Sequence, residues 1–270
     1  MTNQVRTTPN ITGERIKEYL KKGKRFDGRT PEQFREIIIE RDVSKKAEGS
    51  VRVKMGKTEV VVGVKLGLAE PYPDSPNKGN LMTTAELLPL SSERFENGPP
   101  KFPAIETGRV IDRILRESGF IDFEKLCIEE GKKVWNLFVD IYSINDDGNL
   151  LDAAGIGAVA ALRVAKMPKY DAEKDKIDYD TEPTGPVPLK EIPVSITVHK
   201  VGDSLIVDPT REEEDLSETR VTIGGNAEGR ISSMQKGEAA SIDAEQMKQI
   251  FDMAEKVIKE IANKIEKDLK

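Results

Sequence analysis

The sequence predicts an α+β fold in which paired strands pack against long helices in two successive units. Each unit contains a strand hairpin, a further strand and then a helix, so the order of elements repeats once. Apolar residues alternate with charged ones over 49–68, which is typical of half-buried strands, whereas 243–269 carries apolar residues at helical spacing. Strands followed by helices favour a sheet covered by helices over a doubly wound parallel sheet.

The composition is that of a globular chain with a sizeable core and a densely charged surface. Its 270 residues are 37% hydrophobic and 33% charged, and the charged share exceeds the ~25% usual for globular domains. Few aromatics with many charges resemble the ion-pair-rich surfaces of heat-adapted proteins, so we expect unfolding well above about 50 °C. The net charge of −6 argues against nucleic acid covering the whole surface. Local basic patches remain possible at 21–25 and 108–116.

Neither a membrane span nor an export signal is expected. No apolar run approaches the ~20 residues of a bilayer-spanning helix, and residues 1–25 have no apolar core. We therefore expect no membrane contact and a cytoplasmic location. The single Cys127 excludes a disulfide within this sequence and a cysteine-based zinc cluster. The single His199 lies in an alternating pattern, and we interpret it as a half-exposed strand residue.

The first unit begins with a short helix and continues with strands. Ile16, Tyr19 and Leu20 have helical spacing, Thr12 is a candidate N-cap, and Gly23 is a stop signal. Long irregular stretches rich in proline and glycine, such as the one after the hairpin, are uncommon unless they are functional. Strands are expected within 34–43, within the hairpin over 49–68 that turns at 55–57, within 81–90, and within 133–145.

Two helices complete the first unit. A helix over 106–119 aligns Arg109, Arg113 and Arg116 along one side, because their spacing is i, i+4, i+7. A helix over 151–165 consists largely of small residues, which allow close packing on a sheet. The apolar side of the first of these helices is expected to consist of Val110, Ile111, Ile114 and Leu115.

A charged, proline-rich segment separates the two units and is interpreted as a linker. The second unit contains hairpins through Gly202 and through 226–229, followed by a helix whose methionines Met247 and Met253 belong to the core. The expected organisation is an N-terminal helix and arm (1–30), a core domain (31–168), a linker (169–191) and a second domain (192–270).

Six motifs, in order along residues 25–260, resemble the RNase PH family. They read "RFDGRTPEQFREI", "GKTEVVVGVKLG", "FENGPP", "ETGRVIDRILRES", "NDDGNLLDAAGIGAVAALRVAKMP" and "IVDPTREEED". The family includes bacterial RNase PH, polynucleotide phosphorylase and the ring subunits of the exosome. The form "DDGNLLDAA", the N-terminal helix and the extended linker resemble most the non-catalytic ring subunit of the archaeal exosome.

The resemblance implies an RNase PH-type fold of two pseudo-symmetric β-α-β halves, similar to a ribosomal-protein fold. It also implies three kinds of partner: a catalytic sister subunit that alternates with this chain in a six-membered ring, RNA, and RNA-binding cap proteins. The implied reaction of the ring is phosphorolysis, in which inorganic phosphate attacks the last phosphodiester of an RNA 3′ end and releases a nucleoside diphosphate.

Two features of the active members are missing from this sequence. Active members bind phosphate with a Gly-Ser-Arg or Gly-Thr-Arg turn at a helix N-terminus, and the corresponding turn ends here in Leu150, which cannot offset phosphate charge. They protonate the leaving oxygen with an aspartate, whose position aligns with Arg220, or with Thr219 if the alignment shifts by one. Arginine does not release its proton at neutral pH. We expect no catalytic residue, metal ligand or cofactor in this chain.

Two alternatives remain open. One is an active phosphorolytic 3′ to 5′ exoribonuclease that uses another carboxylate, namely Asp208, Asp146 or Asp152. The other is a scaffold that makes no RNA contact. The consecutive acids at 212–215 suggest a metal cluster, but neighbouring carboxylates in a loop point apart, so we interpret them as solvated.

Arginines are the candidate RNA-binding residues. In active members an arginine of the helix matching "GRVIDRILR" grips the RNA backbone, and Arg109 matches it while Arg113 and Arg116 extend the stripe. Arg94, before "FENGPP", is a weaker candidate. Guanidinium contacts to phosphates are independent of sequence and sensitive to salt. The residues alone fit a solvated helix face equally well, and the resemblance favours RNA.

Overall fold

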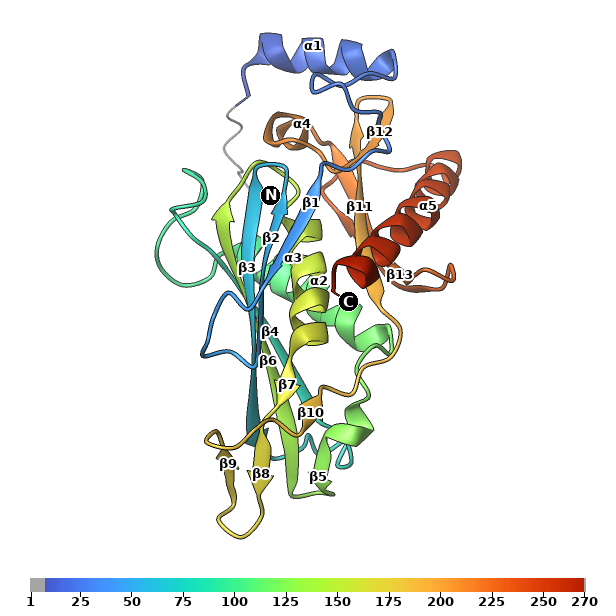
Figure 1. Ribbon diagram of the computed structural model, residues 1–270. Helices are drawn as coiled ribbons and strands as arrows, with labels where there is room; N and C mark the ends of the chain where they lie inside the picture. The colour runs from blue at the N-terminus through green and yellow to red at the C-terminus, as the bar shows by residue number, and fades with distance from the viewer. Residues whose placement is uncertain (1–7, 270) are drawn as a thin grey trace.

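The computed structural model describes residues 8–269 and arranges them in four layers (Figure 1). A six-stranded sheet forms one side, and helices α2 (Phe102–Glu117) and α3 (Leu150–Val164) lie between it and a four-stranded sheet. Helix α5 (Ala244–Asp268) covers the other face of the second sheet. The predicted α+β fold is confirmed. Residues 1–7 and 270, which belong to the predicted arm and second domain, lie outside the described residues.

The six-stranded sheet is built around the predicted hairpin. Its strand order is β1-β2-β3-β6-β4, with β5 beside β6. Strand β4 runs parallel to β6, and the other neighbouring strands are antiparallel. The valines of the hairpin point alternately into the core, as the alternating sequence predicts. The strands are β1 (Ile37–Arg41), β2 (Gly49–Met55), β3 (Thr58–Ala69), β4 (Asn80–Leu87), β5 (Cys127–Glu129) and β6 (Lys133–Asn145).

The four-stranded sheet consists of the two predicted hairpins side by side. Its antiparallel order is β12-β11-β13-β14. Helix α5 begins with a capping box between Asp243 and Gln246, and it buries an apolar stripe that includes Met253. The strands are β11 (Pro193–Val201), β12 (Ser204–Val207), β13 (Thr219–Asn226) and β14 (Ile231–Gly237).

Small residues allow α3 to contact both sheets at once. A Cβ atom on Gly157 would lie 2.7 Å from the Cγ2 of Val62 in the first sheet, and one on Gly155 would lie 2.4 Å from the Oγ of Ser195 in the second. Both distances are shorter than a van der Waals contact, so glycine is required for this approach. The predicted close packing of α3 is confirmed, and it occurs on two sides of the helix.

The expectation for His199 is wrong in part. The residue lies on strand β11, as predicted, but its side chain is 2% exposed rather than half-exposed. Strand β11 is a central strand with α3 on one face and α5 on the other, so both faces are covered. Burial, followed by the charge of the neighbouring Arg220, lowers the pKa of His199 to about 3. The ring is therefore neutral at physiological pH.

Helix α1 (Asn10–Lys21) lies across one end of the molecule (Figure 1). Its buried residues Ile16 and Leu20 pack with Ile206 and with Leu216, which follows the short helix α4 (Arg211–Asp215). The predicted N-cap, Thr12, is wrong: the helix begins earlier, because Pro9 occupies the N-cap position and no side chain caps it.

The predicted linker forms short strands rather than a free tether. Strand β7 (Lys166–Met167) pairs with β10 (Gly185–Pro186), and β8 (Lys169–Asp171) pairs with β9 (Lys176–Asp178).

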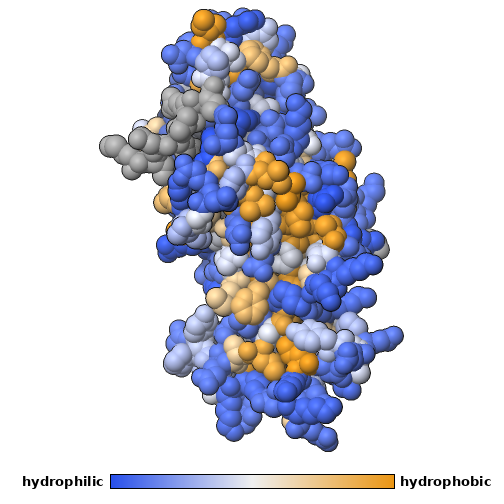
Figure 2. All heavy atoms as spheres, turned by 90° about the vertical axis from the view of Figure 1, so that its left-hand side faces the viewer, coloured by the Kyte–Doolittle hydropathy of each residue, from blue (hydrophilic) through white to orange (hydrophobic). Residues whose placement is uncertain are grey.

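The outer face of the first sheet, seen in Figure 2, is a charged surface interrupted by apolar patches. No helix between residues 8 and 269 has the length and hydrophobicity needed to cross a membrane.

Candidate functional site

Helix α2 presents the predicted arginine stripe to solvent. Its apolar side is buried as predicted by Val110, Ile111, Ile114 and Leu115, while the three arginines are exposed. Gly108 brings the helix close to strand β4, since a Cβ atom there would lie 3.2 Å from the Thr83 carbonyl oxygen. The fold therefore fixes one side of α2 against an edge strand and leaves the cationic side open.

A groove between α2 and β4 collects all three arginines of the stripe. Its volume is about 450 Å³, and it is lined by Arg109, Arg113 and Arg116 together with residues of β4. Thr83 and Thr84 provide hydroxyl groups on the strand side of the groove. We refer to this hollow as the α2 groove.

Two of the three guanidinium groups in the α2 groove have no carboxylate partner. Arg109 forms no hydrogen bond or ion pair with any residue between 8 and 269, and Arg113 donates only to the neutral Gln235, at 3.2 Å. Arg116 is paired with Asp112 at 3.0 Å and also donates to a backbone carbonyl of β4. The groove therefore carries uncompensated positive charge that is exposed to solvent, which attracts a polyanion.

A second hollow lies at the other end of α2 and contains the positions that the RNase PH resemblance assigns to catalysis. Its volume is about 350 Å³, and it is lined by Arg94, Asp146, Leu150, Glu214 and Arg220 among others. We refer to it as the cleft. Leu150 and Arg220 therefore lie in one cleft, as the resemblance implies, although 70 positions separate them in the sequence.

Arg220 is held in the cleft by an ion pair with helix α2. Its Nη2 lies 2.7 Å from the Oε2 of Glu106, and both side chains are less than a fifth exposed. Gly237, opposite Arg220 on β14, leaves room for the guanidinium, since a Cβ atom there would lie 1.8 Å from Nη1. The alternative position, Thr219, is fully buried and donates its hydroxyl to the Gly237 carbonyl. Neither residue offers a proton to a substrate.

Arg94 lies in the cleft, apart from the other three candidate arginines. Its Nη2 is 2.7 Å from the Oδ2 of Asp146, and the two side chains are 12% and 1% exposed. The guanidinium also lies over the ring of Phe95. The structure thus brings Arg109, Arg113 and Arg116 together and places Arg94 in a buried ion pair elsewhere.

The turn that binds phosphate in active members is present here without its cation. Asn149 adopts the left-handed conformation, with φ 58°, and occupies the N-cap position of α3 without a capping hydrogen bond from its side chain. Its Nδ2 donates to Asp208 at 3.0 Å, so the side chain points into the protein. Leu150 follows and lines the cleft with an apolar group. This end of α3 provides no positive side chain for an anion.

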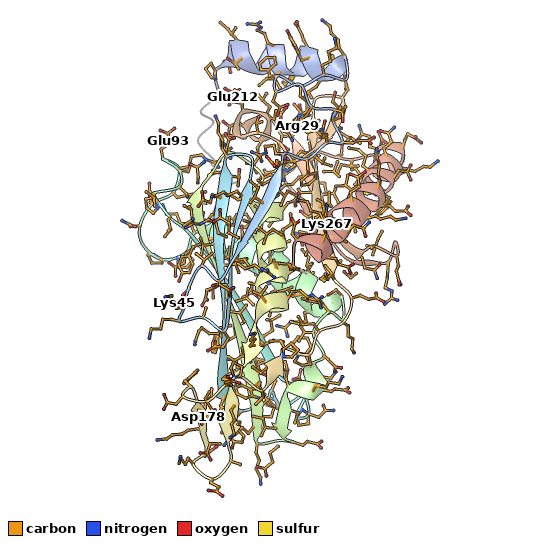
Figure 3. The ribbon with its side chains drawn as sticks, in the orientation of Figure 1. Arg29, Lys45, Glu93, Asp178, Glu212 and Lys267 are labelled. Carbon is orange, nitrogen blue, oxygen red and sulfur yellow. The ribbon has the colours of Figure 1, made fainter. Side chains whose placement is uncertain are left out.

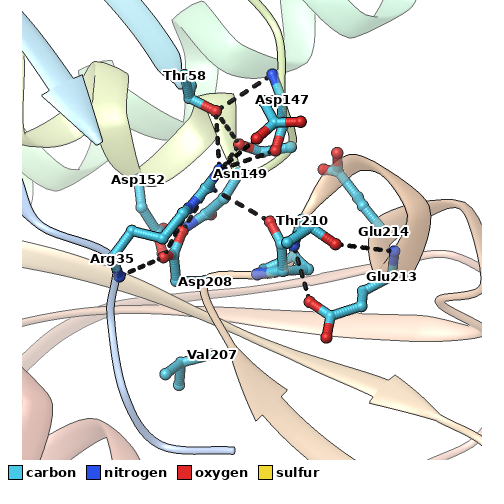
Figure 4. Close-up of polar contacts among 12 residues, drawn as sticks. Arg35, Thr58, Asp147, Asn149, Asp152, Val207, Asp208, Thr210, Glu213 and Glu214 are labelled. Atoms are coloured by element: carbon cyan, nitrogen blue, oxygen red, sulfur yellow. Dashed lines mark hydrogen bonds and ion pairs between the residues drawn. The ribbon is translucent and has the colours of Figure 1, made fainter. Parts of the chain in front are cut away.

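Each of the three alternative carboxylates is buried and bonded to other side chains. Asp208 is fully buried and is bound by Arg29 at 2.8 Å and by Arg35 at 2.7 Å. Figure 4 shows the contact with Arg35. Asp146 is paired with Arg94. Asp152, on α3, is fully buried and accepts two hydrogen bonds from Thr197 on the second sheet, and burial raises its pKa to about 7. None of these three carboxylates is free to reach RNA.

The expectation that the acids at 212–215 are solvated is wrong in part, since Glu213 and Asp215 are buried whereas Glu212 is exposed. They belong to helix α4, whose N-cap Thr210 forms a capping box with Glu213. Glu213 is 4% exposed and forms a buried ion pair with Arg25, and Asp215 is paired with Arg211. Figure 3 shows Glu212, the exposed member, beside α4. Among residues 8–269, no cluster of His, Cys, Asp or Glu has an arrangement that could hold a metal ion.

Sequence reasoning did not identify the partners that close the cleft. Glu106 lies 114 positions from Arg220, and Asp146 lies 52 positions from Arg94. No local spacing or motif joins residues so distant in the chain. Glu106 does directly precede the arginine stripe on α2, and a charged residue beside a conspicuous motif is the one signal that the sequence offered.

Comparison with known proteins agrees with the geometry. The family model for domain 1 of the 3′ exoribonuclease family, RNase PH, matches residues 33–168, and the model for domain 2 matches residues 191–257. The chain belongs to the RNase PH family. The two matches together cover more than half of the chain and include both sheets.

The relatives are archaeal. The chain is 44% identical to the exosome complex component Rrp42 of Thermococcus onnurineus over 97% of each chain. It is also 44% identical to Rrp42 of Methanopyrus kandleri, over 93% of this chain and 94% of the relative. Both relatives are matched over nearly their full length.

Solved structures show the same architecture. A subunit of the Archaeoglobus fulgidus exosome, solved with RNA bound to the active site, superimposes with a TM-score of 0.87 and 41% identity, covering 94% of this chain and 98% of that one. An archaeal exosome core matches with a TM-score of 0.84 and 38% identity, covering 95% and 97%. Rice Rrp46, at 19% identity and a TM-score of 0.67 over 91% and 100% of the two chains, shares the fold.

Proposed function

We propose that this chain is a non-catalytic subunit of an exosome ring, which holds RNA while a catalytic sister subunit degrades it from the 3′ end by phosphorolysis. The observation that carries the proposal is the Arg220–Glu106 ion pair, at the place where active relatives need a proton donor. A guanidinium there cannot protonate a leaving oxygen, and it repels a metal ion. The same reasoning applies to the reverse reaction, in which the ring extends RNA from nucleoside diphosphates.

Binding of phosphate in the cleft is opposed by the pairing of its charges. Arg94 and Arg220 are already neutralised by Asp146 and Glu106. Lys101, at the edge of the cleft, is bound to Glu96, and this contact lowers the pKa of the Glu96 carboxyl. An incoming phosphate would have to displace Asp146 from Arg94 and Glu106 from Arg220, and both of these carboxylates are mostly buried. The cleft is therefore neither a phosphate site nor an acid site.

The α2 groove supports the RNA-holding part of the proposal. Its guanidinium groups at Arg109 and Arg113 are exposed and lack a carboxylate partner. Contacts of this kind bind the RNA backbone without reading sequence, as a subunit that serves a processive degradation complex requires. Arg116 is paired with Asp112, and RNA competes with that pair for it.

The partners follow from the relatives rather than from this chain's surface. The named relatives are exosome components, so we propose an alternating six-membered ring with a catalytic RNase PH-like sister, together with RNA-binding cap proteins. We also propose that the complex acts in the cytoplasm. The active-enzyme alternative has no observation in its favour, since Asp208, Asp146 and Asp152 are buried and bonded.

The proposal is tested by measuring release of nucleoside diphosphate from single-stranded RNA with and without inorganic phosphate. The purified full-length chain is expected to release none, and a ring assembled with the sister is expected to show phosphate-dependent release. A matched preparation of the Arg220→Ala variant measures contaminating nuclease, because its release of nucleoside diphosphate should equal that of the lone wild-type chain. Phosphate-dependent turnover that stays with the lone wild-type chain through successive purification steps would contradict the proposal.

A further inference from the structure

The end of helix α1 is basic in a chain that is acidic overall. Among residues 14–24, five side chains are cationic and two are carboxylates, whereas the whole chain has a net charge of −6. This segment overlaps the basic patch at 21–25, to which the proposed function assigns no role. The patch lies at one end of the molecule, away from the α2 groove (Figure 1).

Several of these cations have no acidic partner. Lys17 is paired with Glu14 at 3.5 Å, and Lys21 lies 3.9 Å from Asp203. The remaining cations, Arg15, Lys22 and Lys24, are exposed and form no ion pair with any of the described residues. Their side chains therefore project positive charge into solvent.

An exposed pair of aromatic rings lies among these cations. Tyr19 is 39% exposed and Phe26 is 48% exposed, and their ring centroids are 4.9 Å apart at an interplanar angle of 86°. The pair is outside the hydrophobic clusters of the fold. Aromatic faces beside flexible cations are the combination by which proteins bind single-stranded nucleic acid, because bases stack on the rings while cations contact the phosphates.

The backbone holds the cations and rings in place. The amides of Lys22 and Lys24 both donate to the Tyr19 carbonyl, at 3.0 and 3.1 Å, and Gly23 permits this turn with φ +66°. Arg25, between Lys24 and Phe26, is buried and bonded to Glu213 and to the carbonyls of the second unit. Since the next residue on each side is exposed, Arg25 anchors the turn and directs Lys24 and Phe26 outward.

We infer that this corner, formed by Tyr19, Lys22, Lys24 and Phe26, is a second contact site for single-stranded RNA. We call it the α1 corner. The inference rests on the proposed function, because it supposes that the chain handles RNA. Charge favours a polyanion over a neutral partner here, and the exposed rings favour unpaired bases over a duplex, whose bases are already stacked.

Charge reversal at the α1 corner tests the phosphate contacts. Lys22→Glu combined with Lys24→Glu in the full-length chain is compared with Lys248→Glu combined with Lys259→Glu, an equal charge change on exposed positions of α5. Binding of a fluorescent single-stranded oligoadenylate is measured by anisotropy at several salt concentrations. The α1 variant should bind about tenfold more weakly, with a salt slope reduced by about 1.4, since each lysine–phosphate contact accounts for ~0.7 of the slope. The α5 variant should change neither value by as much.

Removal of the rings tests base stacking separately from charge. Tyr19→Ala combined with Phe26→Ala should weaken oligoadenylate binding about tenfold, as expected when one base no longer stacks on the protein, and should leave the salt slope unchanged. Ultraviolet crosslinking of the wild-type chain to the same RNA should label the peptide that contains Tyr19 or Phe26. Equal affinities and slopes for the α1 and α5 variants, with no crosslink at this peptide, would overturn the inference and leave an acidic protein surface as the partner of the corner.

A parallel variant distinguishes failure of this inference from failure of the proposed function. Arg109→Ala, Arg113→Ala and Arg116→Ala are combined and measured in the same assay. If this variant binds RNA more weakly while the α1 variants bind normally, only the corner is refuted. If the wild-type chain binds no RNA, both the corner and the RNA-holding function are refuted.

Discussion

The α2 groove and the cleft lie along the same helix, and they differ in how their arginines are paired. In the cleft, Arg94 and Arg220 each form an ion pair with a largely buried carboxylate. In the α2 groove, Arg109 has no partner within residues 8–269, and Arg113 contacts only an amide. The same residue type thus has a structural role at one end of α2 and is free to bind a ligand at the other.

The difference shows why arginine content alone does not locate an RNA site. Separating a buried ion pair costs about 3–5 kcal/mol, so we expect phosphate to compete poorly for Arg94. An exposed and unpaired guanidinium has no such cost, and it gains from release of the counterions around RNA. We therefore expect the pairing state of the arginines, rather than their number, to decide which hollow binds RNA.

The largest expected effect is on stability. Arg94→Ala removes the nearer of the two cations beside Asp146, which is 1% exposed, and leaves Arg211 at 3.7 Å. The free energy of unfolding should therefore fall by about 3 kcal/mol, the lower end of the cost of breaking a buried ion pair. Arg109→Ala removes an exposed side chain and should change that free energy by less than about 0.5 kcal/mol. Urea unfolding of the two variants measures both values. Equal losses of stability in the two variants would show that the arginines of the cleft and of the α2 groove do not differ in their structural role.

The next effect is on RNA affinity. Here the larger loss is expected from substitutions in the α2 groove and the smaller one from Arg94→Ala in the cleft. Combined alanine substitutions at Arg109, Arg113 and Arg116 should weaken binding of RNA to the assembled ring by about 100-fold. The salt slope should fall by about 2, since each arginine–phosphate contact accounts for ~0.7 of it. The ring should remain assembled, because the stripe faces the groove. Arg94→Ala is the matched control. Affinity that is unchanged across salt concentrations would show that the stripe is only a solvated helix face.

A third effect is on the pH dependence of stability, to which two buried titratable groups contribute, Asp152 and His199. Either group would have to reach RNA in order to take part in catalysis. The pKa of Asp152 is raised from 3.8 to about 7, so its contribution to stability is full below the unfolded pKa and is lost as pH rises toward 7. The pKa of His199 is lowered from 6.5 to about 3, so its contribution is present above 6.5 and is lost as pH falls toward 3. From about pH 4 to 6.5, a rise in pH lowers the free energy of unfolding through Asp152 and raises it through His199. The two changes largely cancel.

Asp152→Asn should remove the contribution of Asp152 to the pH dependence of the free energy of unfolding. The contribution of His199 should then become measurable. Relative to the wild-type chain, the free energy of unfolding of the variant should fall by about 1.4 kcal/mol for each pH unit of acidification, or about 2 kcal/mol between pH 6.5 and 5. Urea titrations at these two pH values measure it. Phosphorolysis by the assembled ring should not change, since Asp152 is fully buried. A loss of ring activity without the change in pH dependence would make Asp152 a catalytic candidate again.

The smallest expected effect is that of Arg220→Ala. The ion pair with Glu106 is partly exposed, at 17% and 19%, so its loss should lower the free energy of unfolding by about 1 kcal/mol. RNA affinity and the activity of the ring should stay within about twofold, because neither depends on the cleft. A tenfold loss of RNA affinity would place the cleft on the RNA path.

Much of the fold could be predicted from local patterns. The alternating valines identified the hairpin of β2 and β3, and the spaced apolar residues identified α2 and α5, because each element buries one apolar side and leaves the other side polar. His199 was placed on the correct strand with the wrong exposure. An alternating pattern indicates one buried face, and nothing in it signals that a second layer of helices covers the other.

The site could be predicted in part. The arginine stripe of α2 follows from helical spacing, and Leu150 and Arg220 follow from the family resemblance. The ion pairs that close the cleft do not, because the partners are far apart in the chain: Glu106 and Arg220 are separated by 114 positions, and Arg94 and Asp146 by 52. The burial of Glu213 was missed for the same reason: its partner, Arg25, is 188 positions away.

The most direct test is a crystal structure of the assembled ring with single-stranded RNA. The account predicts backbone phosphates within hydrogen-bonding distance of Arg109 or Arg113, while Arg94 and Arg220 keep their ion pairs with Asp146 and Glu106. A phosphate or an RNA 3′ end bound inside this chain's cleft, with either ion pair broken, would contradict it.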